Sequence, residues 1–128
     1  MMGVALSNQA VCVACGSVNR VPADKPAAAA KCGRCAAPLG LDRPAEVNDA
    51  QLALLLEKST GLILVDVWAP WCGPCRAMAP QFATAAGALA GKARLVKLNA
   101  DQSQMVQSLG VSGIPALILF RDGRIVDR

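Results

Sequence analysis

The 128-residue sequence contains no histidine and no tyrosine. These absences exclude a Ser-His-Asp or Cys-His catalytic apparatus, a tyrosine general acid and a histidine-ligated metal. Any metal bound by this chain must therefore be held by cysteine or carboxylate side chains. Aromatic residues are also scarce, at 3% of the sequence, namely Trp68, Trp71, Phe82 and Phe120.

The charge pattern gives little support for a nucleic-acid or membrane partner. The formal net charge is +4, and the first 44 residues hold five Lys/Arg against two Asp/Glu. No aromatic residue lies between these basic positions, so a nucleic-acid partner is not expected. No run approaches the ~20 apolar residues of a transmembrane helix, so no membrane partner is expected either.

The first residues show none of the features of a secretory signal. The start, MMGVALSNQAVC, has no basic segment, and polar residues interrupt its short apolar run. We therefore expect a cytoplasmic protein, in a compartment that keeps thiols reduced. This expectation disfavours permanent structural disulfides among the cysteines.

All six cysteines occur in C-x-x-C pairs, and these pairs divide the chain into two regions. Two pairs, Cys12/Cys15 and Cys32/Cys35, lie in residues 1–44, which lack a credible apolar core. A segment of this size folds only with a staple or a metal. The spacing C-x2-C-x16-C-x2-C is typical of a four-cysteine site, so we predict that these residues bind one Zn²⁺. Rubredoxin-like iron and two disulfides are the alternatives.

Residues 45–128 have the alternating pattern of an α/β domain. An apolar run with a single acid at 62–67 predicts a strand buried on both faces. A helix over about 75–90 follows, and Pro80 is expected to kink it. Alternating strands and helices predict parallel pairing, whereas Asp122-Gly123 predicts a final antiparallel hairpin. Two further helices are predicted, at 51–58 with Asn48 or Asp49 as the cap and at 103–109 with Asp101 or Ser103 as the cap. The remaining predicted strands are at 94–99, 116–120 and 124–127.

The third pair, Cys72 and Cys75, lies where the strand at 62–67 gives way to a helix. A thiol at a helix start faces unpaired backbone N–H groups and the positive end of the helix dipole, and both favour the thiolate. Gly73-Pro74 spaces the cysteines by one turn, so a small disulfide ring can close and reopen. We interpret the pair as a redox dithiol; half of a metal site or two buried thiols are the alternatives.

The residues around this pair resemble a known family. The segment VDVWAPWCGPCR at 65–76 is similar to the active-site segment of the thioredoxin family, and KLN at 97–99 and GIP at 113–115 resemble its later motifs in order and spacing. With its N-terminal cysteines the chain most resembles the bacterial thioredoxin 2 branch, which has an added zinc-binding segment. The resemblance implies a thioredoxin-like α/β fold over 45–128, a central mixed sheet flanked by helices. A zinc-ribbon-like module and linker over 1–44 would precede it.

The resemblance also implies roles for single residues. Cys72 would attack a substrate disulfide and Cys75 would resolve the mixed disulfide, with an NADPH-dependent thioredoxin reductase restoring the dithiol and no organic cofactor bound. Asp66 stands alone in an apolar strand, where burial would raise its pKa. The pattern leaves open a structural acid, whereas the resemblance implies proton transfer to and from Cys75. Lys97 would be its partner, or else an ordinary exposed strand lysine.

A substrate surface is implied beside the redox pair. The general statistics of X-Pro bonds favour a trans bond at Ile114-Pro115, whereas the family has a cis proline against the active cysteines. Ile114 and Pro115, with Trp71, Gly73 and Pro74, would form a flat apolar platform for an extended substrate strand.

Together these features predict a cytosolic protein-disulfide reductase with a structural or redox-sensing zinc. A redox-gated, zinc-linked chaperone or binding module is the main alternative, and a disulfide donor is a further one. We expect metal binding to fold residues 1–44 and the remainder to fold without it. The chain departs from the family at Ala116, where threonine is usual. It also shows no counterpart, up to Arg128, of the family's later glycine-bearing loop and final helix. We therefore expect that this part of the domain is missing and that one sheet face is bare.

Overall fold

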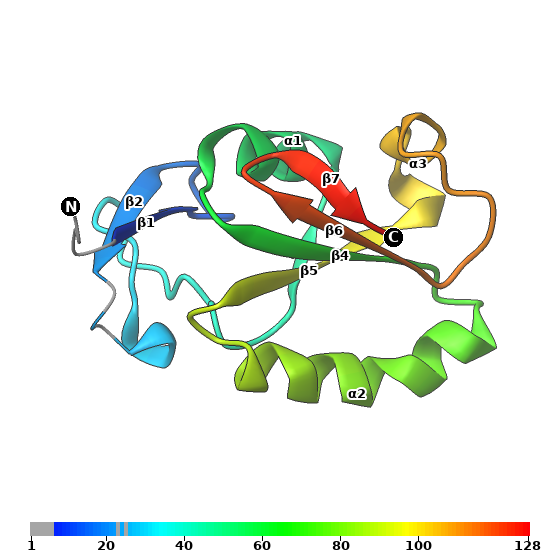
Figure 1. Cartoon of the computed structure of the whole chain (residues 1–128), viewed down its shortest axis with the longest axis horizontal. Coiled ribbons are helices and arrows are strands. Elements are labelled where there is room, and N and C mark those ends of the chain that lie inside the picture. The colour runs from blue at the N-terminus through cyan, green and yellow to red at the C-terminus, as the bar shows by residue number, and fades with distance from the viewer. Residues whose placement is uncertain (1–6, 23, 25) are drawn as a thin grey trace.

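A five-stranded mixed sheet with helices on both faces forms the larger part of the protein, and a two-stranded sheet lies beside it (Figure 1). The computed structural model describes residues 7–22, 24 and 26–128. The larger sheet has the strand order β3-β5-β4-β6-β7. Its strands are β3 (Ala45–Val47), β4 (Leu62–Trp68), β5 (Ala93–Asn99), β6 (Ala116–Arg121) and β7 (Arg124–Asp127). The mixed thioredoxin-like sheet predicted above is confirmed.

Strand β4 lies at the centre of this sheet. It pairs in parallel with β5 and antiparallel with β6, while β3 pairs in parallel with the far edge of β5. The parallel partners β4 and β5 are joined by helix α2 (Gly73–Ala88), as a parallel pair requires a long crossover. Strands β6 and β7 form the predicted hairpin, with Asp122 and Gly123 both at positive φ. Such a turn matches the twist of the paired strands.

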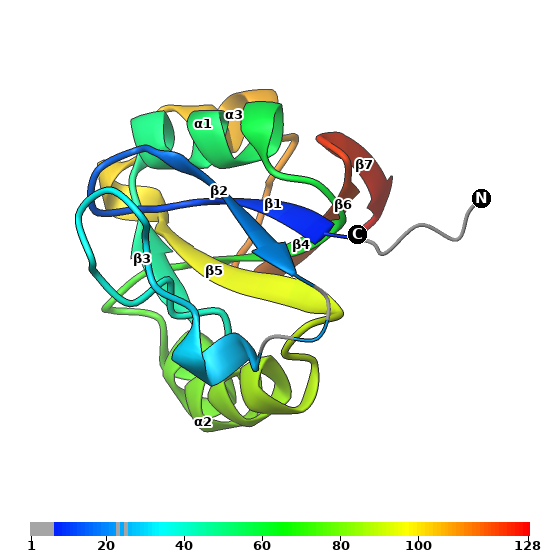
Figure 2. The same cartoon turned by 90° about the vertical axis from the view of Figure 1, so that its left-hand side faces the viewer.

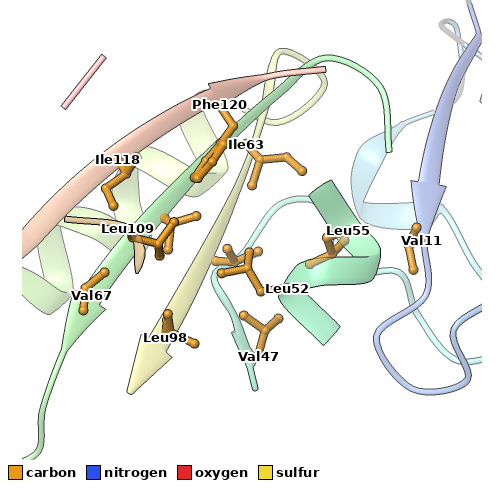
Figure 3. Packing of buried hydrophobic residues seen from close by; sticks show 12 residues of the cluster. Val11, Val47, Leu52, Leu55, Ile63, Val67, Leu98, Leu109, Ile118 and Phe120 are labelled. Atoms are coloured by element: carbon orange, nitrogen blue, oxygen red, sulfur yellow. The ribbon is translucent and has the colours of Figure 1, made fainter. Parts of the chain in front are cut away.

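Helix α1 (Asp49–Lys58) closes the main core. Asn48 caps it, and Gln51 completes a capping box by accepting the Asn48 N–H at 2.8 Å. Its buried residues Leu52 and Leu55 pack on the sheet beside Val65 and Val67 of β4. Figure 3 shows these leucines between α1 and the sheet, together with residues of β5 and β6. The predicted helix and its cap are therefore confirmed.

Two helices differ from their predicted bounds. Helix α2 begins at Gly73, two residues earlier than predicted, because Cys72 itself serves as its N-cap and Pro74 lies in its first turn, where a missing N–H costs nothing. Helix α3 (Met105–Ser108) is shorter than the predicted 103–109 and follows the 3-10 helix η2 (Ala100–Gln102). The carboxylate of Asp49 accepts hydrogen bonds from the Ser103 hydroxyl and the Gln104 N–H, which holds these residues outside the helix.

The N-terminal segment forms an antiparallel pair, β1 (Ser7–Val11) and β2 (Val18–Pro22), followed by the 3-10 helix η1 (Ala27–Ala29). This segment has a small hydrophobic cluster of its own, whose buried members are Ala10, Cys12, Ala30, Cys32 and Leu39. Leu39 is buried although it falls in the stretch interpreted as a linker. Val11 joins the core of the larger sheet instead. The two parts are thus packed together, as Figure 2 shows for β1, β2, α1 and β5.

The two faces of the large sheet are covered unequally. On the α1 face, Ile118 and Phe120 of β6 are buried in the main core. On the opposite face, α2 packs through Phe82 and Ala86 against Leu95 of β5. Leu117 of β6 is 38% exposed. Among the described residues, none of the helices is long and apolar enough to cross a membrane.

We predict that, among the glycines that the structure describes, an added side chain costs most at Gly123. A Cβ there would lie 2.5 Å from the Leu56 carbonyl oxygen, and φ is +85°. Gly91 has the same φ of +85° but nothing within 4 Å of an added Cβ, so it serves as a matched control. Gly91→Ala should lower the free energy of unfolding by roughly 1–2 kcal/mol from backbone strain alone. Gly123→Ala should cost a further ~1–3 kcal/mol through the clash. Urea unfolding measures both, and equal losses would contradict the prediction.

Candidate redox and metal sites

The redox pair lies where β4 passes into α2. Cys72 is the N-cap of α2, and its Sγ accepts a hydrogen bond from the Cys75 N–H at 3.2 Å. Both side chains are buried, and the structure joins them as a disulfide with a Cα–Cα distance of 5.2 Å. An amide N–H directed at Sγ and the positive end of the helix dipole both stabilise a thiolate at Cys72 once the bond is reduced.

The rim of the pair is formed by an exposed tryptophan. Trp71 is 68% exposed, and its Nε1–H donates to both carboxylate oxygens of Asp101 at 3.0 Å. The sequence pattern indicated Asp101 only as a helix cap, and its contact with Trp71 was not predicted. The topology could have found it, because Asp101 follows the carboxyl end of β5 and Trp71 follows that of β4, and these ends share one edge of the sheet.

The residues predicted to form the substrate platform differ in how far they are exposed. Ile114 packs on the buried cluster of Ala69, Cys72 and Cys75, and the Ile114-Pro115 bond is cis. The family resemblance implied this isomer, and the general statistics of X-Pro bonds did not. Gly73 and Pro74 are exposed at the start of α2, and Pro115 is half-buried.

Asp66 lies in the middle of β4, on the α2 face. Its side chain is 1% exposed, and neither carboxylate oxygen has a hydrogen-bond partner within the described residues. Burial raises the pKa of Asp66 to about 6, a shift that the charge of Lys97 reduces and that of Glu46 increases. A buried carboxyl that titrates near neutral pH can both accept and release a proton under working conditions.

Lys97 stands between two acids across three neighbouring strands. It pairs in register with Asp66 on one side and Glu46 on the other. Its Nζ lies 3.8 Å from Glu46 Oε2 and 4.4 Å from the centre of the Trp68 ring. In the part of the chain that the structure describes, the ion pair of Lys97 is with Glu46 and not with Asp66. Glu46 was missed because the short strand β3 was not predicted.

The four N-terminal cysteines converge. Their Sγ atoms all lie within 4.8 Å of one another. Two of these distances are 3.7 Å for Cys12–Cys35 and 3.6 Å for Cys15–Cys32. Tetrahedral coordination with Zn–S bonds near 2.3 Å requires sulfur atoms about 3.8 Å apart. The cluster therefore fits a tetrahedral thiolate-bound ion, and the two predicted cysteine pairs come together as one site.

The two cysteine turns share one geometry. The Gly16 N–H donates to the Cys12 carbonyl at 2.8 Å, and the Ala36 N–H donates to the Cys32 carbonyl at 2.9 Å. Gly16 and Ala36 both have positive φ. In the second turn, the backbone amides of Cys35 and Arg34 point toward Cys32 and lower the pKa of its thiol to about 6. The Ala37 N–H acts to lower the pKa of Cys35, but burial and the neighbouring thiols raise it to about 11. The protein groups alone therefore favour a thiolate at Cys32 and not at Cys35.

Two known families match separate parts of the chain, one with the first two cysteine pairs and one with the third pair. Residues 43–128 match the family described as Thioredoxin, and residues 11–37 match the zinc ribbon described as "Thioredoxin 2, N-terminal". Together these matches include all three C-x-x-C pairs.

Individual relatives agree with this result. The chain is 42% identical over 81 residues to "Thioredoxin" of Haemophilus influenzae, covering 62% of this chain and 76% of that protein. It is 44% identical over 80 residues to "Thioredoxin" of Pseudomonas aeruginosa, covering 62% and 74%. The solved structure of a mutant thioredoxin from Halobacterium salinarum superposes with a TM-score of 0.62 at 32% identity, covering 69% of this chain and 77% of that one. The chain therefore belongs to the thioredoxin family of protein-disulfide oxidoreductases and carries the N-terminal zinc-ribbon segment of thioredoxin 2.

Proposed function

We propose that this protein is a cytosolic reductase of protein disulfides, with Cys72 as the attacking and Cys75 as the resolving cysteine. The observation that carries the proposal is the position of Cys72 as the N-cap of α2, with the Cys75 N–H directed at its sulfur. We assign residues 45–128 to the catalytic domain and residues 1–44 to a metal-binding module with its linker. The family matches at 43–128 and 11–37 support this division.

The reaction is two successive thiol–disulfide exchanges. The Cys72 thiolate attacks one sulfur of a substrate disulfide, forms a mixed disulfide and releases the other substrate sulfur as a thiolate. The Cys75 thiolate then attacks Cys72 Sγ and releases the second substrate thiolate, so the substrate gains two electrons and Cys72–Cys75 becomes a disulfide. A dithiol of an NADPH-dependent thioredoxin reductase restores the starting state.

Asp66 is the proposed proton carrier for Cys75. Cys75 must lose its proton to attack and regain it after reduction, and a nearby group with a pKa of about 6 can serve both steps. Lys97 modulates the charge of Asp66 from the neighbouring strand. We infer that a water molecule carries the proton between Asp66 and Cys75, because no hydrogen bond joins their side chains.

The proposed substrate surface is the rim around the disulfide. Trp71, Gly73 and Pro74 are exposed next to it in the sequence, Ile114 packs on the cysteine pair, and Pro115 is half-buried. A flat apolar surface with free backbone groups suits an extended segment of a substrate protein.

The four-cysteine cluster is the proposed site of one Zn²⁺. Zinc favours tetrahedral thiolate ligands, and it would supply the binding energy that holds the two cysteine turns together. Because thiolates are oxidisable, the same site can sense oxidants by losing its metal.

We predict opposite phenotypes for the two active cysteines. Cys72→Ser should abolish reduction of an insulin-type disulfide in the presence of NADPH and thioredoxin reductase. Cys75→Ser should accumulate a mixed disulfide with the substrate, because the resolving thiolate is gone. Non-reducing electrophoresis with mass analysis of the trapped species distinguishes them. Trapping by Cys72→Ser instead would reverse the two roles.

Asp66→Asn should slow turnover at neutral pH and stabilise the fold. A carboxyl whose folded pKa lies above its unfolded pKa binds a proton on folding, so the parent protein loses stability as pH rises from about 4 through 6. A shift of about two pKa units corresponds to about 3 kcal/mol, which the asparagine variant should regain at pH 7 and not at pH 3.5. Urea unfolding at both pH values measures this, with the exposed Glu57→Gln as control. A stability gain that is independent of pH, or an unchanged pH–rate profile, would contradict the assignment.

Metal analysis tests the zinc site directly. We expect one zinc per chain in protein purified under reducing conditions. A thiol reagent should titrate two cysteines readily after reduction, and six after chelation, because the four ligands are then released. Six reactive thiols without a chelator would contradict the site.

A further inference from the structure

A buried arginine of β5 joins the thioredoxin part to both halves of the ribbon. The side chain of Arg94 is 7% exposed. Its Nη1 donates to the Val11 carbonyl at 2.7 Å and its Nη2 donates to the Leu39 carbonyl at 3.0 Å. Val11 directly precedes Cys12, whereas Leu39 follows the second cysteine turn. One guanidinium group therefore fixes the backbone before the first pair of ligands and after the second pair.

A second contact reaches the backbone inside the first cysteine turn. Gln51 Nε2 donates to the Val13 carbonyl at 2.8 Å, and Val13 lies between Cys12 and Cys15. The same amide accepts the Asn48 N–H through Oε1, so it is held in place by the capping box of α1. Three ribbon carbonyls close to the ligands in sequence are thus bound by two side chains of the other part.

Apolar contacts also join the ribbon to the thioredoxin part. Val11 is buried in the core that contains Leu52 and Leu55 of α1, and Figure 3 shows it on the α1 side of that core. Gly16 approaches α1 so closely that an added Cβ would lie 3.3 Å from Leu54 Cδ2. The Gln9 and Thr60 backbones are also joined, since the Thr60 N–H donates to the Gln9 carbonyl at 3.1 Å. Movement of the first cysteine turn therefore disturbs the core of the thioredoxin part.

Groups outside the ligand set of a metal site commonly fix the ligands, and their loss weakens metal binding. In this protein the groups that fix the cysteine turns, Arg94 and Gln51, belong to the thioredoxin part and not to the ribbon. The backbone of Arg94 is fixed by strand β5, and the side chain of Gln51 is fixed by the helix cap of α1. Both residues can therefore present their N–H donors before the ribbon is ordered. Ordering the two cysteine turns in advance reduces the conformational entropy that metal binding must overcome.

We propose that Arg94 and Gln51 are positioning residues of the metal site, and that metal binding and the stability of the thioredoxin part are therefore energetically coupled. The proposal rests on the zinc site proposed above. Coupling of this kind is reciprocal: the factor by which folding of the thioredoxin part tightens zinc binding equals the factor by which zinc stabilises that part. It also departs from the expectation that residues from 45 onward are indifferent to the metal.

Two variants separate the contacts from the fold. Arg94→Met keeps an unbranched apolar side chain and removes both donors. Gln51→Glu keeps an acceptor for the Asn48 N–H, and glutamate is a favoured capping-box residue, but it leaves no donor for the Val13 carbonyl. If Arg94→Met fails to fold, Gln51→Glu carries the test alone. Arg124→Met and Gln81→Glu repeat the same chemical changes at exposed positions and serve as controls.

The first measurement is zinc affinity of the full chain, by competition with a chromophoric chelator. Each variant should bind zinc about tenfold more weakly than the parent protein, in the range typical of lost outer contacts. The controls should match the parent. Failure of the parent protein to bind zinc would overturn the zinc site itself, whereas equal affinity of parent and variants would overturn the coupling alone.

The second measurement reports only on the thioredoxin part. Both tryptophans, Trp68 and Trp71, lie in residues 45–128, so fluorescence follows the unfolding of that part. Chelation should lower the parent's melting temperature by several degrees, at constant reducing conditions, and should lower that of each variant by distinctly less. An equal decrease in parent and variants, or no decrease in the parent, would overturn the proposal.

Discussion

The burial of β4 on both faces is the constraint on which the chemistry depends. Its two edges are bonded to β5 and β6, α1 covers one face and α2 packs on the other. This strand leads through residues 69–71 to Cys72, which is buried at the start of α2. It also holds Asp66 in a position where it has no hydrogen-bond partner among the described residues and where its charge is costly. Burial raises the pKa of Asp66, whereas the Cys75 N–H and the start of α2 favour the thiolate of Cys72.

The protein buries two opposite charges and treats them differently. Arg94 is buried with two carbonyl acceptors, and burial lowers its pKa to about 10, so it remains charged at neutral pH. Asp66 has no hydrogen-bond partner within the described residues, and its pKa rises toward neutrality. The first arrangement suits a permanent structural contact, and the second suits a group that changes protonation state. Arg94 lies near the start of β5, where it binds the ribbon, and Asp66 lies toward the end of β4, which leads to Cys72.

The elements of the thioredoxin part could be predicted from the sequence where the pattern is local. The apolar run of β4, the Asn48 cap and the Asp122-Gly123 turn each specify their structure within a few residues, and each was confirmed. Strand β3 was missed because it is three residues long and is stabilised by pairing with β5, which no local pattern shows. Helix α3 was overestimated because Asp49, distant in the sequence, binds two of its expected residues.

The site was predictable where it is made of cysteines. The spacing of the first two pairs predicted the four-cysteine cluster, and the position of the third pair at the end of a strand predicted the disulfide. Contacts that depend on tertiary structure were not visible: Asp101 with Trp71, Glu46 with Lys97, and Arg94 with the ribbon carbonyls. The cis bond before Pro115 followed from the family resemblance, because general statistics favour trans.

The two cysteine turns have the same backbone hydrogen bond but different residues at the position with positive φ. The first has Gly16, for which a positive φ costs nothing, and the second has Ala36 at φ 66°. A left-handed alanine is disfavoured by roughly 1–2 kcal/mol, so the contacts around the second turn must hold it there. The turns therefore form an unequal pair, in which the second is strained and the first is relaxed. The backbone strain is therefore concentrated in the turn that ends at Ala36, whereas the turn that ends at Gly16 is relaxed and packs against Leu54 of α1.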